Sequence, residues 1–177
     1  MFAVLRRRRE RQATIDRLYG AIVAQARLPE FYSGLHVPDT LESRFDLLVL
    51  HVHLVFRRLV RDEEARAMGQ AVFDRFVADM DDSLREMGTG DLAVPKRMRA
   101  MGEAFYGRAE AYDLALRDDD DVRLVAALLR NVYAGGESAA ADAQKLARYV
   151  RQAEVALAGD DASAIARGEI SFPAPEY

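Results

Sequence analysis

Apolar side chains recur at intervals of three and four residues through most of this 177-residue chain. The pattern is strongest in residues 41–60, where apolar side chains occupy much of the helical circumference. Spacing near 3.6 residues is typical of helices that bury one face, and a helix that is apolar nearly all round is typical of a core. No stretch shows the alternation of a strand between turn signals. We therefore predict an all-α, single-domain bundle of about six helices, with 41–60 at its centre.

Proline, glycine and acidic residues mark where the predicted helices begin and end. Asp39 or Thr40 is expected to cap the second helix, and Glu42 stands three residues after Asp39 as a capping box requires. The predicted helices cover residues 10–28, 41–60, about 62–87, 95–116, 122–133 and 138–158, with a short turn near 162–167. The chain is thus divided into a flexible basic arm (1–9), a helical domain (10–158) and a C-terminal tail (159–177).

Charge and composition restrict the classes of function. The formal net charge of −4 and the isoelectric point near 5.5 argue against a nucleic-acid binder as a whole, and we expect no DNA partner. The sequence contains no Cys, which excludes disulfides and thiolate metal sites. No apolar run reaches the roughly 18–20 residues that a bilayer requires. The first apolar residues precede the arginines, the reverse of a signal peptide. We expect a cytoplasmic protein.

Four consecutive arginines, Arg6, Arg7, Arg8 and Arg9, make the first residues strongly basic. A solvated, frayed terminus is the simpler interpretation, since chain ends are often poorly ordered. The alternative is electrostatic docking to an anionic membrane surface or to RNA, including the ribosome. Both interpretations stay open on the sequence.

The residue pattern contains neither a metal site nor a catalytic constellation. His51 and His53 are two positions apart on a predicted helix and point about 200° apart, so we expect one in the core and the other at the surface. Asp79 and Asp82 share a helical face, as do the ends of the run 118–121, which leaves a Mg²⁺-dependent helical enzyme as the weakest alternative. We predict no catalytic residue, no metal, no cofactor and no small-molecule substrate.

Acidic and basic residues face each other across a Gly-rich corner between the third and fourth predicted helices. Cations in the first turn of a helix oppose its dipole, so either Glu86 or Asp91 neutralises them or a partner does. The residues predicted to bind a partner are Arg85, Glu86, Asp91, Lys96, Arg97, Arg99, Tyr106 and Arg108. The residues expected to shape the corner are Gly88, Gly90, Pro95 and Gly107.

Two further features of this region allow two interpretations each. The methionines are typical core residues, but methionine also forms adaptable binding surfaces. They are Met80, Met87, Met98 and Met101. Gly102 and Gly107 lie inside a predicted helix, where each glycine destabilises the helix by about 1 kcal/mol relative to Ala. Close approach of another helix, or of a partner, would explain them.

The same region resembles a known protein family. The string REMGTGDLAVPKRMRAM, followed by FYGR, is similar to sequence shared by the ubiquinol–cytochrome c reductase assembly chaperones of bacteria and mitochondria. The upstream strings LHVHLVFRRL and LYGAIVAQARLPEFYSGLHVPDT resemble that family too. The similarity runs from about Leu18 to Leu116, with the basic arm and the C-terminal third outside it.

The resemblance implies a non-enzymatic helical chaperone that binds newly made cytochrome b and helps it enter the respiratory bc1 complex. It also implies a cytoplasmic protein that is peripherally associated with the inner membrane, and mitochondrial members associate with the ribosome. The residues that match the shared motif are Arg85, Glu86, Gly88, Gly90, Asp91, Pro95, Lys96, Tyr106, Gly107 and Arg108. A role in contacting cytochrome b is carried over to them as an expectation.

Overall fold

A computed structural model describes residues 2–61, 63, 65–118 and 120–176. Its α-helices are α1 (Phe2–Ala26), α2 (Pro29–Ser33), α3 (Leu41–Val60), α4 (Arg66–Glu86), α5 (Val94–Ala115), α6 (Val122–Asn131), α7 (Ala140–Gly159) and α8 (Ala162–Arg167), and a 3-10 turn spans Glu137–Ala139. Six of these helices have ten or more residues. Because the described residues include no strand, the all-α prediction is confirmed.

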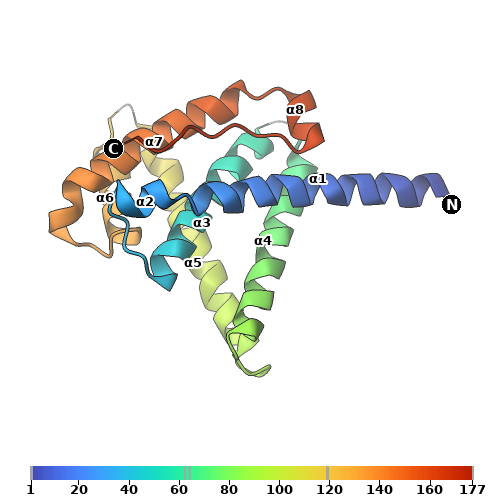
Figure 1. The fold of residues 1–177 in the computed structure, drawn as a ribbon, viewed down its shortest axis with the longest axis horizontal. Coiled ribbons are helices and arrows are strands. Elements are labelled where there is room, and N and C mark those ends of the chain that lie inside the picture. Colours follow the sequence, from blue (N-terminus) through green and yellow to red (C-terminus); the bar gives the residue numbers. More distant parts are fainter. Residues whose placement is uncertain (1, 62, 64, 119, 177) are drawn as a thin grey trace.

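Helix α3 lies at the centre of the fold, where α1, α4, α5 and α7 all pack against it (Figure 1). Every residue from Leu47 to Val55 is buried, as expected for a helix that is apolar nearly all round. Thr40 caps its N-terminus, because the Thr40 side-chain oxygen accepts a hydrogen bond from the backbone N–H of Ser43 at 3.2 Å. Asp39 instead pairs with Arg44 at 2.6 Å, so the predicted capping box of Asp39 and Glu42 does not form.

Helices α4 and α5 lean away from α7 and meet at a corner, which forms the lower tip of the molecule in Figure 1. Aromatic rings join the two helices to each other and to α3. The ring of Phe105 lies 5.0 Å from Phe73 and 5.6 Å from Phe76, and Phe76 lies 6.4 Å from Phe45 of α3. The corner is therefore held away from the body by a packed aromatic base.

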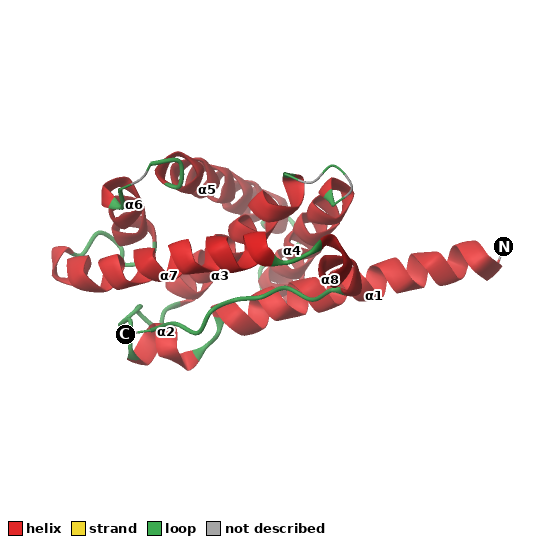
Figure 2. Cartoon of the chain, turned by 90° about the horizontal axis from the view of Figure 1, so that it is seen from above, coloured by secondary structure: helices red, strands yellow, loops and turns green. Residues whose placement is uncertain are grey.

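Helix α1 runs unbroken from Phe2, so the predicted helix start at Glu10 is wrong. Its first turns extend beyond the rest of the molecule (Figures 1 and 2). Near the point where α1 reaches the body, the Arg11 guanidinium donates a hydrogen bond to the Ala67 carbonyl at 3.2 Å. The basic arm is thus a helical extension, and its flexibility stays a prediction.

The C-terminal residues pack onto the bundle after α8, which coincides with the predicted turn at 162–167. The Phe172 ring lies 5.4 Å from the His51 ring. The Gln25 side-chain amide of α1 donates a hydrogen bond to the Pro173 carbonyl at 2.9 Å. The extended tail therefore contributes to the core (Figure 2).

Some other boundaries differ from expectation or lie outside the described residues. Helix α6 ends at Asn131, two residues before the predicted end. Helix α4 begins at Arg66, although the acidic residues expected at its start are only partly described. The residues outside the described part that touch a prediction are Met1, Asp62, Glu64, Asp119 and Tyr177.

Both histidines of α3 are buried, so the expectation of one exposed histidine is wrong. The reason is that α1, α4, α5 and α7 all pack against α3, and together they cover both histidines. The His51 Nδ1 atom lies 2.7 Å from the Leu47 carbonyl oxygen, which can only accept, so Nδ1 carries the proton. Its Nε2 atom then accepts a hydrogen bond from the Tyr149 hydroxyl at 2.7 Å. Burial lowers the pKa of His51 and of His53 to about 4.

Stability should therefore fall as the pH drops from 6.5 towards 4. The folded-state pKa of each histidine is near 4 and the unfolded-state pKa is near 6.5. Between these values the unfolded chain binds a proton that the folded protein does not, so the stability present above pH 6.5 is lost on acidification. Each histidine should remove about 1.4 kcal/mol of unfolding free energy per pH unit within this window. Urea unfolding at several pH values measures the slope. Substituting both residues with Gln should flatten it, and an unchanged slope in that variant would contradict the assignment.

Candidate protein-docking site

The corner between α4 and α5 is built on a glycine in the left-handed region. Gly88 has a φ of 80°, a conformation that residues with a Cβ rarely adopt. Its N–H donates to the Arg85 carbonyl at 2.9 Å, and the Thr89 N–H donates to the Leu84 carbonyl at 3.0 Å. This pair of bonds is a Schellman ending, which satisfies the last carbonyls of α4 and reverses the chain.

The chain then turns into α5 at Gly90 and Pro95. The Gly90 carbonyl accepts hydrogen bonds from Ala93 at 2.8 Å and from Val94 at 3.2 Å. Pro95 stands in the first turn of α5, where its missing N–H removes no helical hydrogen bond. Leu92, at the tip, is 99% exposed. The corner thus presents an apolar side chain and the first turn of α5 to solvent.

The charges of the corner are not all neutralised within it. Arg85 pairs with Asp81 and with Asp91, each at 2.6 Å. The Arg97 guanidinium donates to the Thr89 hydroxyl at 3.2 Å. Among the described residues, no ion pair is formed by Lys96 or by the other exposed charges of the corner, Glu86 and Arg99. Asp91 therefore pairs with Arg85 at the end of α4. The cations at the start of α5 stay exposed to solvent.

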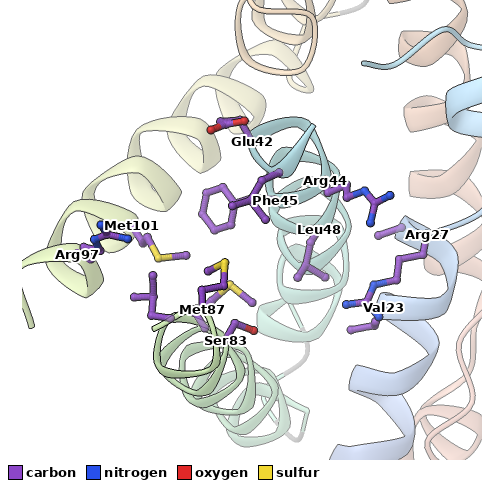
Figure 3. A pocket seen from close by; sticks show the side chains of 14 residues that line it. Val23, Arg27, Glu42, Arg44, Phe45, Leu48, Ser83, Met87, Arg97 and Met101 are labelled. Atoms are coloured by element: carbon purple, nitrogen blue, oxygen red, sulfur yellow. The ribbon is translucent and has the colours of Figure 1, made fainter. Parts of the chain in front are cut away.

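Beside the corner lies an apolar groove of about 390 Å³ between α1, α3, α4 and α5 (Figure 3). Its apolar lining comes from all four helices and includes three of the four methionines. These residues are Val23, Ala26, Leu41, Phe45, Leu48, Met80, Leu84, Met87 and Met101. Arg27, Arg44 and Arg97 stand at its sides, with Glu42 and Ser83 as the other polar members. Arg97 belongs to both features, so the groove and the corner form one continuous surface.

Sequence reasoning identified only part of this surface. Met80, Met87, Met101 and Arg97 were singled out as possible recognition residues, whereas the contributions of α1 and α3 were missed. The sequence pattern predicts that Phe45 and Leu48 are core residues. Periodicity shows that a helix face is apolar, but it does not show whether a neighbouring helix covers that face. Met98 packs against the core instead of lining the groove.

Tyr106, Gly107 and Arg108 do not lie at the corner. Tyr106 is 64% exposed and borders a second groove, between α3 and α5. A Cβ built on Gly107 would meet no atom within 4 Å, and the same is true of Gly102. No helix of the described chain therefore explains either glycine by close approach.

Arg108 is engaged inside the protein. Its Nε atom lies 2.6 Å from Oδ1 of Asp46, a residue of α3 that is only 3% exposed. The guanidinium also lies over the Phe45 ring at 5.9 Å and donates to the Ala104 carbonyl at 3.2 Å. Burial raises the pKa of Asp46, and the Arg108 charge opposes that shift. Arg108 thus compensates a buried carboxylate.

Three of the four aspartates considered for Mg²⁺ have other partners. Asp79 accepts a hydrogen bond from the Tyr19 hydroxyl at 2.8 Å. Asp118 pairs with Arg123 at 3.3 Å, and Asp121 pairs with Arg151 at 2.9 Å. Within the described ranges, no group of three or more His, Cys, Asp or Glu side chains is placed to hold a metal ion.

Comparison with known proteins identifies the family of the chain. A model of the ubiquinol-cytochrome C chaperone family matches residues 33–172, and the chain belongs to that family. The match reaches Phe172, so the C-terminal part that the motif resemblance left out is a family feature as well.

Curated relatives are named as assembly factors of ubiquinol-cytochrome c reductase. The chain is 31% identical to ubiquinol-cytochrome-c reductase complex assembly factor 1 of Xenopus laevis over 66% of this chain and 58% of that protein. It is 27% identical to the mouse factor over 77% of this chain and 46% of that one. The crystal structure of the Cbp3 homolog from Brucella abortus superposes with a TM-score of 0.86 at 38% identity, covering 98% of this chain and 97% of that one. The chain spans about half the length of the curated relatives it matches.

The substitution Arg108→Ala should destabilise the fold, since it leaves the buried Asp46 carboxylate without its counter-charge. We expect a loss of about 3 kcal/mol, at the lower end for a buried pair because Arg108 is partly exposed. The loss should be smaller at pH 5 than at pH 7.5, because Asp46 can then take up a proton. Urea unfolding measures both. The double variant Asp46→Leu with Arg108→Met should recover much of the stability, and parental stability of Arg108→Ala would disprove the structural role.

Proposed function

We propose that this chain is a non-enzymatic assembly chaperone that binds newly made cytochrome b and promotes its incorporation into ubiquinol–cytochrome c reductase. Family membership supports the assembly role, since the relatives are described as assembly factors of that complex. The observation that carries the proposal is the continuous surface of apolar groove and cationic corner. Such a surface suits a client with apolar helices and charged loops.

The groove can hold a client reversibly. Burial of one large apolar side chain contributes roughly 1.5–3 kcal/mol, so two or three anchors in the groove would supply moderate affinity once the entropy of association is subtracted. Methionine side chains adapt to differently shaped neighbours, which suits transient contact with an incompletely folded protein. Holding and release of the client then need no covalent chemistry.

The place of action is proposed to be the cytoplasm, with peripheral association with the inner membrane. Among the described residues, no helix combines the length and apolarity needed to cross a bilayer. The N-terminal part of α1 extends outward and exposes Arg6, Arg7, Arg8 and Arg9 (Figure 2). Attraction of these cations to anionic lipid would contribute about 1 kcal/mol each.

The same extension favours a second candidate function, association with the ribosome. A projecting helix with four consecutive exposed arginines is suited to RNA phosphates, whose binding is strongly salt-dependent. This role is compatible with chaperoning, because a client could be received as it is synthesised.

Charge reversal at the corner should weaken capture of cytochrome b without loss of fold. The double variant Lys96→Glu with Arg99→Glu places repulsive charges where the side chains are exposed and without ion pairs among the described residues. We expect several-fold less cytochrome b to co-purify with the tagged chain from detergent-solubilised membranes. Arg117→Glu, an exposed substitution just past the end of α5, is the matched control. Full recovery of cytochrome b with the corner variant, or normal bc1 spectra in a deletion strain, would count against the proposal.

Removal of the four arginine charges of the arm should abolish association with anionic membranes or with ribosomes, because the groove does not mediate either association. Replacing Arg6, Arg7, Arg8 and Arg9 by Gln keeps good helix formers and retains the contact of Arg11 with the body. Sedimentation with ribosomes and flotation with anionic vesicles, each over a range of salt, separate the two partners. We expect loss of one or both associations, and parental sedimentation and flotation would show that the arm has neither role.

A further inference from the structure

The groove has an apolar floor, and apolar side chains at its border extend this floor onto the exposed surface. Phe45 and Leu48 of α3 form one part, and Met87, just past the end of α4, and Met101 of α5 face them (Figure 3). At the border, Leu41 is 62% exposed and Met87 is 53% exposed. The groove has a volume of about 390 Å³, which is enough to receive large side chains of a ligand. The exposed apolar residues at its border extend the area that such a ligand can contact. An elongated apolar ligand fits this shape.

Cations stand on two sides of the apolar floor. Arg27 and Arg44 lie on the α1 side, and Arg97 lies across the groove on the α5 side (Figure 3). Arg44 shares its charge with Asp39, whereas the described residues provide no ion pair for Arg27 or Arg97. Among the described residues that line the groove, Glu42 is the one acidic residue. The sides of the groove therefore carry an excess of positive charge.

We propose, on the basis of the chaperone role above, that this groove binds one amphipathic or membrane-type helix of the client whose apolar face is bordered by carboxylates on both sides. Anchors at positions i, i+3, i+4 and i+7 would pack against the apolar floor, as in other helix-in-groove complexes. Asp or Glu residues beside that face would meet Arg27 on one side and Arg97 on the other. The three methionines let helices of different sequence use the same floor.

The arrangement of the arginines distinguishes a helix from a phospholipid. A phosphate headgroup is held best by donors that converge on one point. Here Arg97 lies on the opposite side of the groove from Arg27 and Arg44 (Figure 3). Separated cations suit a ligand as wide as a helix, with acidic residues on each side of its apolar face.

A labelled peptide tests this directly with the full chain. The probe is a water-soluble helical peptide of about five turns, with Leu and Phe at the anchor spacing and Glu beside them on both sides. A second peptide has Lys in place of every Glu. Fluorescence anisotropy should show binding of the Glu peptide about tenfold tighter than the Lys peptide, as two or three partly exposed ion pairs would give. The double variant Arg27→Glu with Arg97→Glu should reverse this preference.

Apolar-floor variants complete the test. Leu41→Glu and Met87→Glu alter exposed residues, so the fold should persist, and each should weaken both peptides. Val155→Glu, on an exposed residue of α7, is the matched control and should leave binding unchanged. Equal affinity for the two peptides, or full binding by Met87→Glu, would overturn the inference. Binding of anionic phospholipid vesicles through Arg27 and Arg97, with no peptide binding, would identify a lipid site instead. Failure of the peptides while cytochrome b still co-purifies would remove this inference and leave the chaperone role standing.

Discussion

Enclosure of the middle of α3 is the constraint on which the rest of the structure depends. Its residues Leu47–Val55 are entirely buried, and a helix of this kind must be enclosed by other elements. Enclosure also places His51 and His53 in the interior, where they must be neutral and where the Leu47 carbonyl and the Tyr149 hydroxyl satisfy the His51 ring. The C-terminal tail completes this enclosure beside His51. Core packing and the expected loss of stability in acid thus have one origin.

The groove follows from the same enclosure. Near the N-terminal half of α3, α4 and α5 lean away towards their corner, while α1 passes on the other side (Figure 1). Helices that lean apart leave part of the apolar surface between them uncovered, and methionine side chains line the space that remains. The result is an apolar opening next to an exposed corner, with Arg97 shared by both. A binding surface of this kind needs no dedicated loop, only a hairpin held at an angle by Phe73, Phe76 and Phe105.

Charges in this region divide into those that hold the fold and those that face outward. Arg85 is bound by two aspartates, and Arg108 is bound to the buried Asp46. Lys96 stands in the first turn of α5, where the helix dipole opposes a cation. Arg99 follows in the second turn, and neither residue forms an ion pair with another described residue. Such residues reduce stability slightly, which is consistent with a role in binding a partner of opposite charge. The family motif therefore mixes structural and exposed charges.

Local signals in the sequence determined the fold class, the bounds of α3 and α8, and the sites of the chain reversal at Gly88 and Pro95. These features depend on periodicity and on backbone preferences of nearby residues, which are visible without a partner. Tertiary structure alone decided that His53 is buried, that Arg108 forms an ion pair with Asp46, and that residues from four helices line one groove. Each of these depends on which segments distant in sequence meet. The periodicity of side chains within one helix does not predict which other helix packs against it, or how much space remains between the two helices.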